Sequence, residues 1–136
     1  MKKLILKNVS RYVLDRIPEL GSYHNYLSLD SDEKFDLPYV LFGVLYKFYV
    51  DNFSNHEIRK KVDQLIENIS SSSGKELEEL ICFGFLENIN MRSNIFDDMI
   101  NGFGKNTRRL LKETIEHNEK LGKLQKGVYK RFGVSG

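Results

Sequence analysis

The residue types that most often carry catalysis or bind metals are sparse in this 136-residue chain and lie far apart in its sequence. The three histidines, His24, His56 and His117, show neither a His-x-x-x-His spacing nor a neighbouring cysteine, so the sequence predicts no metal site. The single cysteine, Cys82, stands among apolar neighbours, and a thiol buried in such surroundings is inert because burial raises its pKa. We therefore expect no catalytic, cofactor-binding or metal-binding residues, and we do not expect an enzyme.

Two patterns look like parts of active sites but have a structural explanation. In segment 101–107 glycines, a lysine and a threonine precede a helix, yet the spacing of a phosphate-binding loop and its preceding strand are missing. We predict a turn there, in which Gly102 and Gly104 supply a positive φ and Asn106 or Thr107 caps the next helix. The carboxylate pairs at 78–79 and 97–98 are neighbours on a helix, which point about 100° apart, so solvated faces explain them.

An acidic segment with aromatic neighbours is the strongest candidate for a binding surface. Residues 30–36 contain four carboxylates against one lysine, and two tyrosines lie just before them. The Asp-x-Asp spacing lacks the glycine and the terminal glutamate of a calcium loop. Carboxylates around tyrosines can dock into a basic cleft, whereas the alternative is a solvated loop that ends in a helix cap. The predicted partner-binding residues are Tyr23, Tyr26, Asp30, Asp32, Glu33 and Asp36, together with Glu76 and Glu79 from a second acidic stretch that also contains Glu78 and Glu87.

Charge is distributed unevenly along the chain, although the formal net charge is only +2. Residues 1–103 carry 12 Lys/Arg and 16 Asp/Glu, a net of −4, whereas residues 104–136 carry 9 Lys/Arg and 3 Asp/Glu, a net of +6. The sequence thus predicts an acidic body with a basic C-terminal end, which differs from the continuous basic face of a nucleic-acid-binding protein.

Several features favour a cytoplasmic protein. A single cysteine cannot form an internal disulfide, which suits a reducing compartment. The apolar run near the N-terminus stops at Lys7, so we expect no signal peptide. No stretch approaches the roughly 20 apolar residues that span a bilayer, so we expect no membrane partner.

Helical periodicity dominates the chain and predicts an all-α, single-domain bundle of about six helices, with mostly antiparallel neighbours. Segment 39–53 is apolar nearly all round, which is typical of a central helix. Capping boxes are predicted at 54–57 and 73–76, and Gly84 in mid-helix predicts close approach of a neighbouring helix. The expected helices cover residues 2–17, 39–53, 57–69, 76–89, 95–100 and 105–120.

The chain is expected to divide into a helical domain, residues 1–121, and a basic tail, residues 122–136. Basic residues between Lys120 and Arg131 stand near Tyr129 and Phe132, a combination that can contact RNA. Such a tail is more often solvated or folded back on an acidic body, so nucleic acid is the less favoured partner.

Two longer stretches resemble a known group of proteins. Segment 74–89, an acidic helix with Gly-Phe-Leu-Glu, precedes a glycine turn and Thr-Arg-Arg at 102–109; Pro-Glu-Leu at 18–20 and Leu-Pro-Tyr-Val at 37–40 fit the same pattern. Over residues 18–118 the chain resembles small helical proteins found beside bacterial polymorphic toxins, including immunity proteins of contact-dependent growth inhibition systems. The resemblance implies stoichiometric neutralisation of a cognate toxin domain, often a nuclease, in the cytosol. Nuclease inhibitors are often acidic overall, whereas here only the body is.

Two functions follow as hypotheses. The first is an immunity protein, or antitoxin, that occludes the active site of a bacterial toxin through its acidic and aromatic side chains. The second is a nucleic-acid-binding regulator that uses the basic C-terminal segment. The oligomeric state stays open.

Overall fold

A computed structural model describes residues 4–23, 38–72 and 74–120, and these residues form six α-helices and no strand. The all-α fold predicted from periodicity is therefore confirmed. A 3-10 turn, Pro18–Ser22, follows the first helix, and a π-helical turn, Ile81–Phe85, and a second 3-10 turn, Leu86–Asn88, follow the fourth. The helices are α1 (Val9–Arg16), α4 (Pro38–Asp51), α5 (His56–Ser70), α6 (Lys75–Leu80), α7 (Phe96–Gly102) and α8 (Lys105–Lys120).

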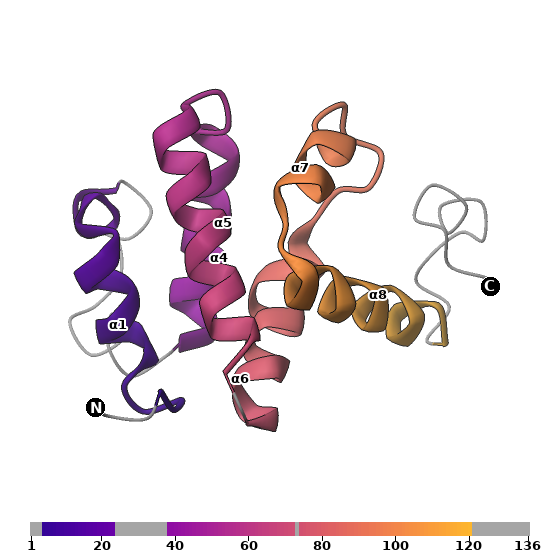
Figure 1. The fold of residues 1–136 in the computed structure, drawn as a ribbon, viewed down its shortest axis with the longest axis horizontal. Helices are drawn as coiled ribbons and strands as arrows, with labels where there is room; N and C mark the ends of the chain where they lie inside the picture. The colour runs from indigo at the N-terminus through magenta and orange to yellow at the C-terminus, as the bar shows by residue number, and fades with distance from the viewer. Residues whose placement is uncertain (1–3, 24–37, 73, 121–136) are drawn as a thin grey trace.

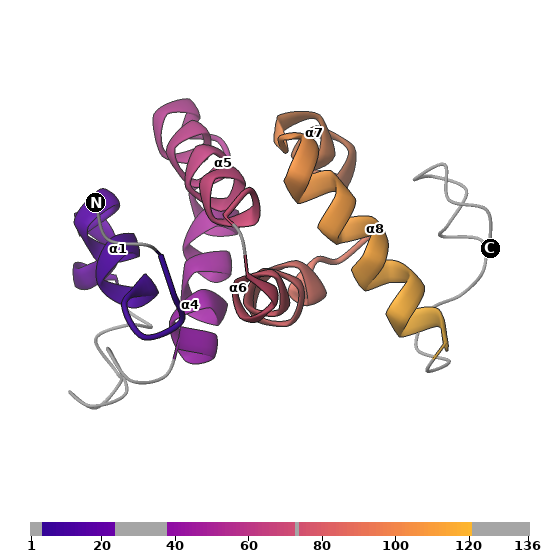
Figure 2. The same ribbon diagram turned by 60° about the horizontal axis from the view of Figure 1, so that its bottom comes forward.

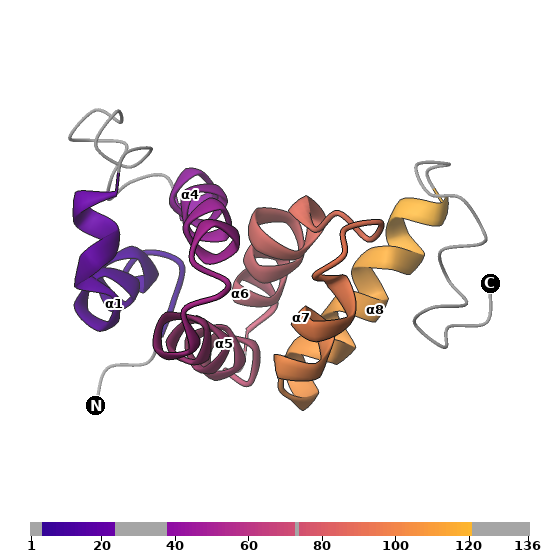
Figure 3. The ribbon, with the colours of Figure 1, turned by 90° about the horizontal axis from the view of Figure 1, so that it is seen from above.

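The helices succeed one another across the molecule roughly in chain order (Figure 1). Helices α4 and α5 lie side by side, with α1 on one side of them and α6 on the other. Helix α8 lies beyond α6, and α7 lies beside the first turns of α8 (Figures 2 and 3). This arrangement leaves α4 between α1 and the π-helical turn, and most of its apolar residues are buried. They are Leu41, Phe42, Val44, Leu45, Phe48 and Tyr49.

One predicted helix start and one predicted helix cap are wrong because side chains bond the backbone elsewhere. The first helix begins at Val9 rather than residue 2, since the Asn8 side chain accepts a hydrogen bond from the Ile5 N–H at 2.9 Å and holds a turn there. Asn55, and not Ser54, caps α5: its Oδ1 accepts from the N–H groups of Glu57 at 3.1 Å and Ile58 at 3.2 Å. Both residues are good caps, and only the backbone path selects between them.

Predicted helix 76–89 is not a single α-helix. It begins as α6, after Gly74 with φ of +133°, then widens into the π-helical turn and tightens into the second 3-10 turn. Gly84 is buried within the π-helical turn, and a Cβ added there would lie 3.2 Å from Phe42 Cβ and 3.1 Å from Leu80 Cδ1. The predicted close approach of a helix to Gly84 is therefore confirmed, and that helix is α4.

Helix α8 has the bounds that periodicity predicted, and its buried face carries Leu110, Leu111 and Ile115. Residues 24–37, which contain the whole acidic segment 30–36, lie outside the described residues, as do Ser73 of the second predicted capping box and the tail, 121–136. The boundary predicted at residue 121 stays a prediction.

Candidate functional site

The predicted partner-binding residues fall into two groups. Tyr26, Asp30, Asp32, Glu33 and Asp36 lie outside the described residues. Of the remaining residues, Tyr23 is held against the body of the protein. Its ring meets Phe48 edge-on, with centroids 5.2 Å apart, and its hydroxyl donates to the Asp51 carboxylate. Tyr23 is half-buried in the described structure, so part of its side chain stays accessible to a partner.

Glu76 and Glu79 lie on an exposed face that the structure completes with two aromatic rings. Spacings of three and four residues place Glu76, Glu79 and Phe83 on one side of α6 and the π-helical turn. Tyr39, from the start of α4, lies beside Gly84, because its Cδ1 is 3.5 Å from the position of an added Cβ there. We call Tyr39, Glu76, Glu79 and Phe83 the acidic–aromatic face.

Exposure distinguishes this face from the rest of the described surface. Only three large hydrophobic side chains are strongly exposed within the described ranges, and Tyr39 at 43% and Phe83 at 39% are two of them. Partial burial raises the pKa of Tyr39, and the nearby carboxylates of Glu79 and Glu76 add to that rise. Aromatic rings beside carboxylates thus meet solvent at one place, although Tyr39 belongs to the segment 39–53 that the sequence predicted to be central.

Neighbouring charges on α6 have other roles. Glu78 forms an ion pair with Arg109 of α8 at 2.8 Å, which ties α6 to α8. Among the described residues, no ion pair holds Glu76 or Glu79, and Lys75 is the only cation on α6. The ring of Phe83 contacts His117 of α8 at a centroid distance of 5.1 Å, which fixes one edge of the face.

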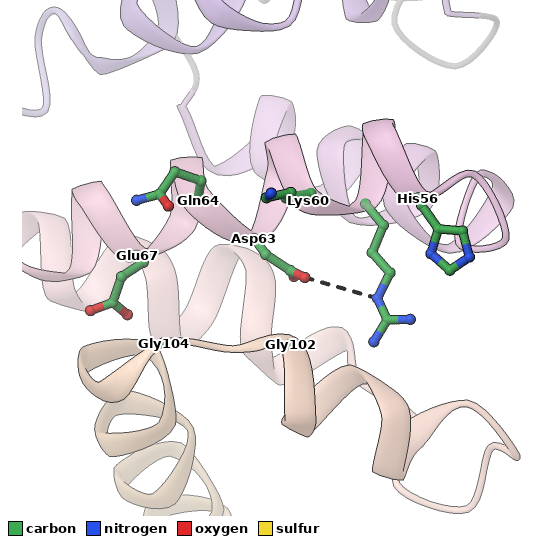
Figure 4. A pocket seen from close by; sticks show the side chains of 8 residues that line it. His56, Lys60, Asp63, Gln64, Glu67, Gly102 and Gly104 are labelled. Carbon is green, nitrogen blue, oxygen red and sulfur yellow. Dashed lines mark ion pairs between the residues drawn. The ribbon is translucent and has the colours of Figure 1, made fainter.

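A separate polar groove of about 410 Å³ lies between α5 and the turn that joins α7 to α8 (Figure 4). Both histidine and carboxylate side chains line it, and these residue types occur in catalytic and metal-binding sites. Its lining residues are His56, Arg59, Lys60, Asp63, Gln64, Glu67, Gly102 and Gly104.

Glu67 caps the N-terminus of α8 from a distance of 40 residues in sequence. Its Oε1 accepts from the backbone N–H of Thr107 at 2.9 Å and from its hydroxyl at 2.8 Å. Its Oε2 accepts from the backbone N–H of Asn106 at 3.1 Å and from its side-chain amide at 2.8 Å. Partial burial raises the pKa of Glu67, but these hydrogen bonds outweigh it and the net pKa is lowered. The prediction that Asn106 or Thr107 caps α8 is therefore wrong, because both donate to Glu67.

The glycines of this turn are required for space rather than for backbone conformation. Within the described residues only Gly74 has a positive φ, so the positive φ predicted for Gly102 and Gly104 is wrong. A Cβ on Gly102 would lie 2.6 Å from Asp63 Oδ2, and one on Gly104 would lie 2.5 Å from Glu67 Oε1. The α7–α8 turn is pressed directly against the two carboxylates of α5.

Asp63 is the most buried carboxylate of the groove. The hydroxyl of Tyr49 donates to its Oδ1 at 2.6 Å, and Arg59 Nε lies 3.9 Å from its Oδ2. Burial raises the pKa of Asp63 above its ordinary value, since it exceeds the opposing effects of Tyr49 and Arg59. Arg59 also donates to the Asp98 carbonyl and lies 4.1 Å above the Phe53 ring. The carboxylates of the groove thus bind parts of the protein itself, and we assign the groove a structural role.

We expect the free energy of unfolding of Asp63→Asn at pH 7 to be equal to or greater than that of the wild type. A raised folded-state pKa means that Asp63 stabilises the fold fully below its unfolded pKa, and that this contribution is lost as pH rises through the folded pKa. Asparagine stays neutral and still offers an oxygen to Tyr49. Urea unfolding from about pH 3 to about pH 7 measures the difference between the variants.

Asp15→Asn, at an exposed position of α1, is the control for that measurement and should change the free energy of unfolding by less than about 0.5 kcal/mol. A loss of more than about 1 kcal/mol in Asp63→Asn at pH 7 would contradict the prediction. It would show that the ion pair with Arg59 outweighs the desolvation of the carboxylate.

The predicted burial of the thiol is confirmed. Cys82 is 7% exposed, its Sγ lies 3.6 Å from the Leu110 carbonyl, and burial raises its pKa. In the part of the chain that the structure describes, no cluster of three potential metal ligands occurs. None of the described helices has the length and apolar character needed to cross a bilayer.

The described residues define a small all-α protein whose exposed aromatic and uncompensated acidic side chains meet on one face. Its family is also known: the chain belongs to the family described as Domain of unknown function (DUF7674), whose model matches residues 10–119. No curated protein and no solved structure shows a significant match to the chain.

Proposed function

We propose that this protein is an immunity protein, which binds a cognate bacterial toxin domain and neutralises it by covering the toxin's active site. The observation that carries the proposal is the acidic–aromatic face. Tyr39 and Phe83 expose their rings between carboxylates that no cation of the described residues neutralises in an ion pair. The resemblance of segments 74–89 and 102–109 to immunity proteins supports the same role.

The face has the composition of a binding hot spot. Buried aromatic side chains supply most of the energy of a typical interface, and surrounding charges speed and orient the encounter. Rigid backing matters as well, because a side chain that is already ordered loses less entropy on binding. His117 supports Phe83, and the packing of α4 on the π-helical turn holds Tyr39 in place.

Charge complementarity indicates the kind of toxin surface that would fit. Carboxylates on this face suit a basic cleft, as in a domain that binds phosphate groups. An interface of ordinary size buries about 800 Å² on each partner, so residues beyond these four take part on this proposal. The predicted contacts of segment 30–36 stay a prediction, because it lies outside the described residues. On this proposal the protein acts in the cytosol of the bacterium that makes the toxin.

The direct test is to mix the purified protein with the product of the neighbouring toxin gene. A stoichiometric complex and loss of toxicity on co-expression are expected. If neither appears, the proposal is wrong.

Substitutions on the acidic–aromatic face test whether it is the surface that binds the toxin. We expect Glu76→Gln/Glu79→Gln to slow association about tenfold at low salt and to weaken its salt dependence. We expect Tyr39→Ala/Phe83→Ala to act on dissociation instead, with at least a tenfold increase in its rate. Surface plasmon resonance at several salt concentrations separates the two effects.

The matched control for charge is Glu57→Gln/Glu116→Gln, which removes two exposed carboxylates from α5 and α8. This control should bind as the wild type does. If it slows association as much as the α6 variant, steering comes from the overall charge, and the acidic–aromatic face is not the docking site.

A further inference from the structure

A second groove, of about 510 Å³, lies between α7 and α8 and is lined mainly by cations. Lys105, Arg108 and Lys112 succeed one another at spacings of three and four residues, so they share one face of α8. Asp97 is the only carboxylate among the described residues that line it. The sequence predicted a basic C-terminal end from residue 104, and the fold places the first cations of that end beside α7.

Hydrogen bonds to the backbone hold the side chain of Arg108, which lines this groove, in one position. Its Nε donates to the carbonyls of Ile100 at 3.1 Å and Phe103 at 3.0 Å, and its Nη2 donates to the Asn101 carbonyl at 3.3 Å. These bonds satisfy carbonyls at the C-terminal end of α7 and hold the guanidinium group in the lining of the groove. Arg109, in contrast, is shared between Glu78 and Glu113, so its charge is offset.

Lys105 and Lys112 are the charges left to meet a ligand. Both are exposed, and no ion pair of the described residues involves either one. Seven residues of helix separate them by about 10 Å along the axis. At this separation the two ammonium groups can contact different phosphates of one strand.

We propose that this groove binds the phosphate backbone of single-stranded nucleic acid without sequence preference. An acidic protein segment could also pair with lysines, but protein interfaces depend on aromatic or aliphatic anchors at their centre. Of the described residues that line the groove, none is aromatic and Ile100 is the one aliphatic side chain. Phosphate contacts from spaced cations supply essentially all of sequence-independent nucleic-acid binding, so such binding does not require an aromatic anchor. This inference rests on α7 and α8 and is independent of the proposed function.

Fluorescence anisotropy with the full chain tests the proposal. The probe is a labelled oligothymidylate of about 20 nucleotides, which exceeds the site of one small domain. We expect binding at low salt that weakens linearly with the logarithm of salt concentration. Lys105→Gln/Lys112→Gln should lower affinity at least fivefold and reduce the salt slope by about 1.4, since each phosphate contact on a single strand contributes about 0.7.

Two charge-matched variants locate the site. Lys7→Gln/Lys60→Gln removes two exposed lysines from elsewhere on the described surface, and Lys123→Gln/Lys126→Gln removes two from the tail. Both should keep most of the affinity and salt slope of the wild type. The proposal is overturned if the wild type does not bind the oligonucleotide, or if either variant loses as much affinity as Lys105→Gln/Lys112→Gln. It is also overturned if labelled poly-glutamate binds more tightly than the oligonucleotide, which would assign the groove to an acidic protein.

Discussion

We expect Glu67→Ala to lower the free energy of unfolding by about 3 kcal/mol, although it removes one half-exposed side chain. Hydrogen bonds to a charged group contribute roughly 1.5–3 kcal/mol each, and partial exposure reduces the sum of the four made by Glu67. Its loss leaves the N-terminus of α8 without a cap and Thr107, which is fully buried, without its main partner. Chemical denaturation followed by circular dichroism measures the effect.

The pH dependence of stability should change with it. Because the folded-state pKa of Glu67 is lowered, its contribution is present above the unfolded pKa, near 4.5, and is lost as pH falls through the folded pKa. Wild type and Glu67→Ala should therefore converge in acid. Glu116→Ala, at an exposed position of the same helix α8, is the control and should change stability by less than about 0.5 kcal/mol at every pH.

Gly104→Ala should act through the same contact. Its Cβ would occupy the position of the Glu67 carboxylate, so the carboxylate must move and release α8. The double variant Glu67→Ala/Gly104→Ala should then be less destabilised than the sum of the two single variants. Strict additivity would show that Gly104 matters for some reason other than the carboxylate behind it.

We expect Gly84→Val to lower the free energy of unfolding by about 3 kcal/mol as well. Gly84 is where α4 crosses the π-helical turn, and a Cβ there would already lie 3.2 Å from Phe42 Cβ, which belongs to a fully buried side chain. The two methyl groups of valine must push the two segments apart, and overpacking of this kind costs about 1–3 kcal/mol or more. Thermal unfolding monitored by calorimetry measures the loss.

Gly43→Ala is the matched control because Gly43 lies in α4 with nothing within 4 Å of an added Cβ. Alanine is the better helix former, so this variant should gain up to about 1 kcal/mol. Opposite signs at two helical glycines would show that space, and not helix propensity, decides the role of Gly84. A stable Gly84→Val would mean that α4 does not press on the π-helical turn.

Regular elements of this protein follow from its sequence because their determinants are local. Helix α8 begins at Lys105 and ends at Lys120 as its periodicity predicts, and the almost continuous apolar run of α4 predicts its burial. Cys82 is buried for the same reason, since its neighbours repeat at helical spacing. The choice between Ser54 and Asn55 as a cap is the kind of detail that such patterns leave undecided.

The sequence predicted two of the four residues of the acidic–aromatic face. Glu76 and Glu79 were identified by their charge, but Tyr39 lies in the apolar segment that predicted a buried helix, and no pattern singled out Phe83. Their exposure depends on how α4 crosses the π-helical turn, Ile81–Phe85, at Gly84.

The sequence by itself thus determined the helical class, the position of most helices and the division into acidic and basic parts. Only the tertiary structure decided which charges stay available. Glu67 accepts hydrogen bonds from Thr107, and Asp63 accepts one from Tyr49. In the described residues, no ion pair involves the four charges that stay accessible to a partner, which are Glu76, Glu79, Lys105 and Lys112. The physical reason is that periodicity reports which face of a helix is buried, but a hydrogen bond between residues 40 positions apart depends on where the chain returns in space.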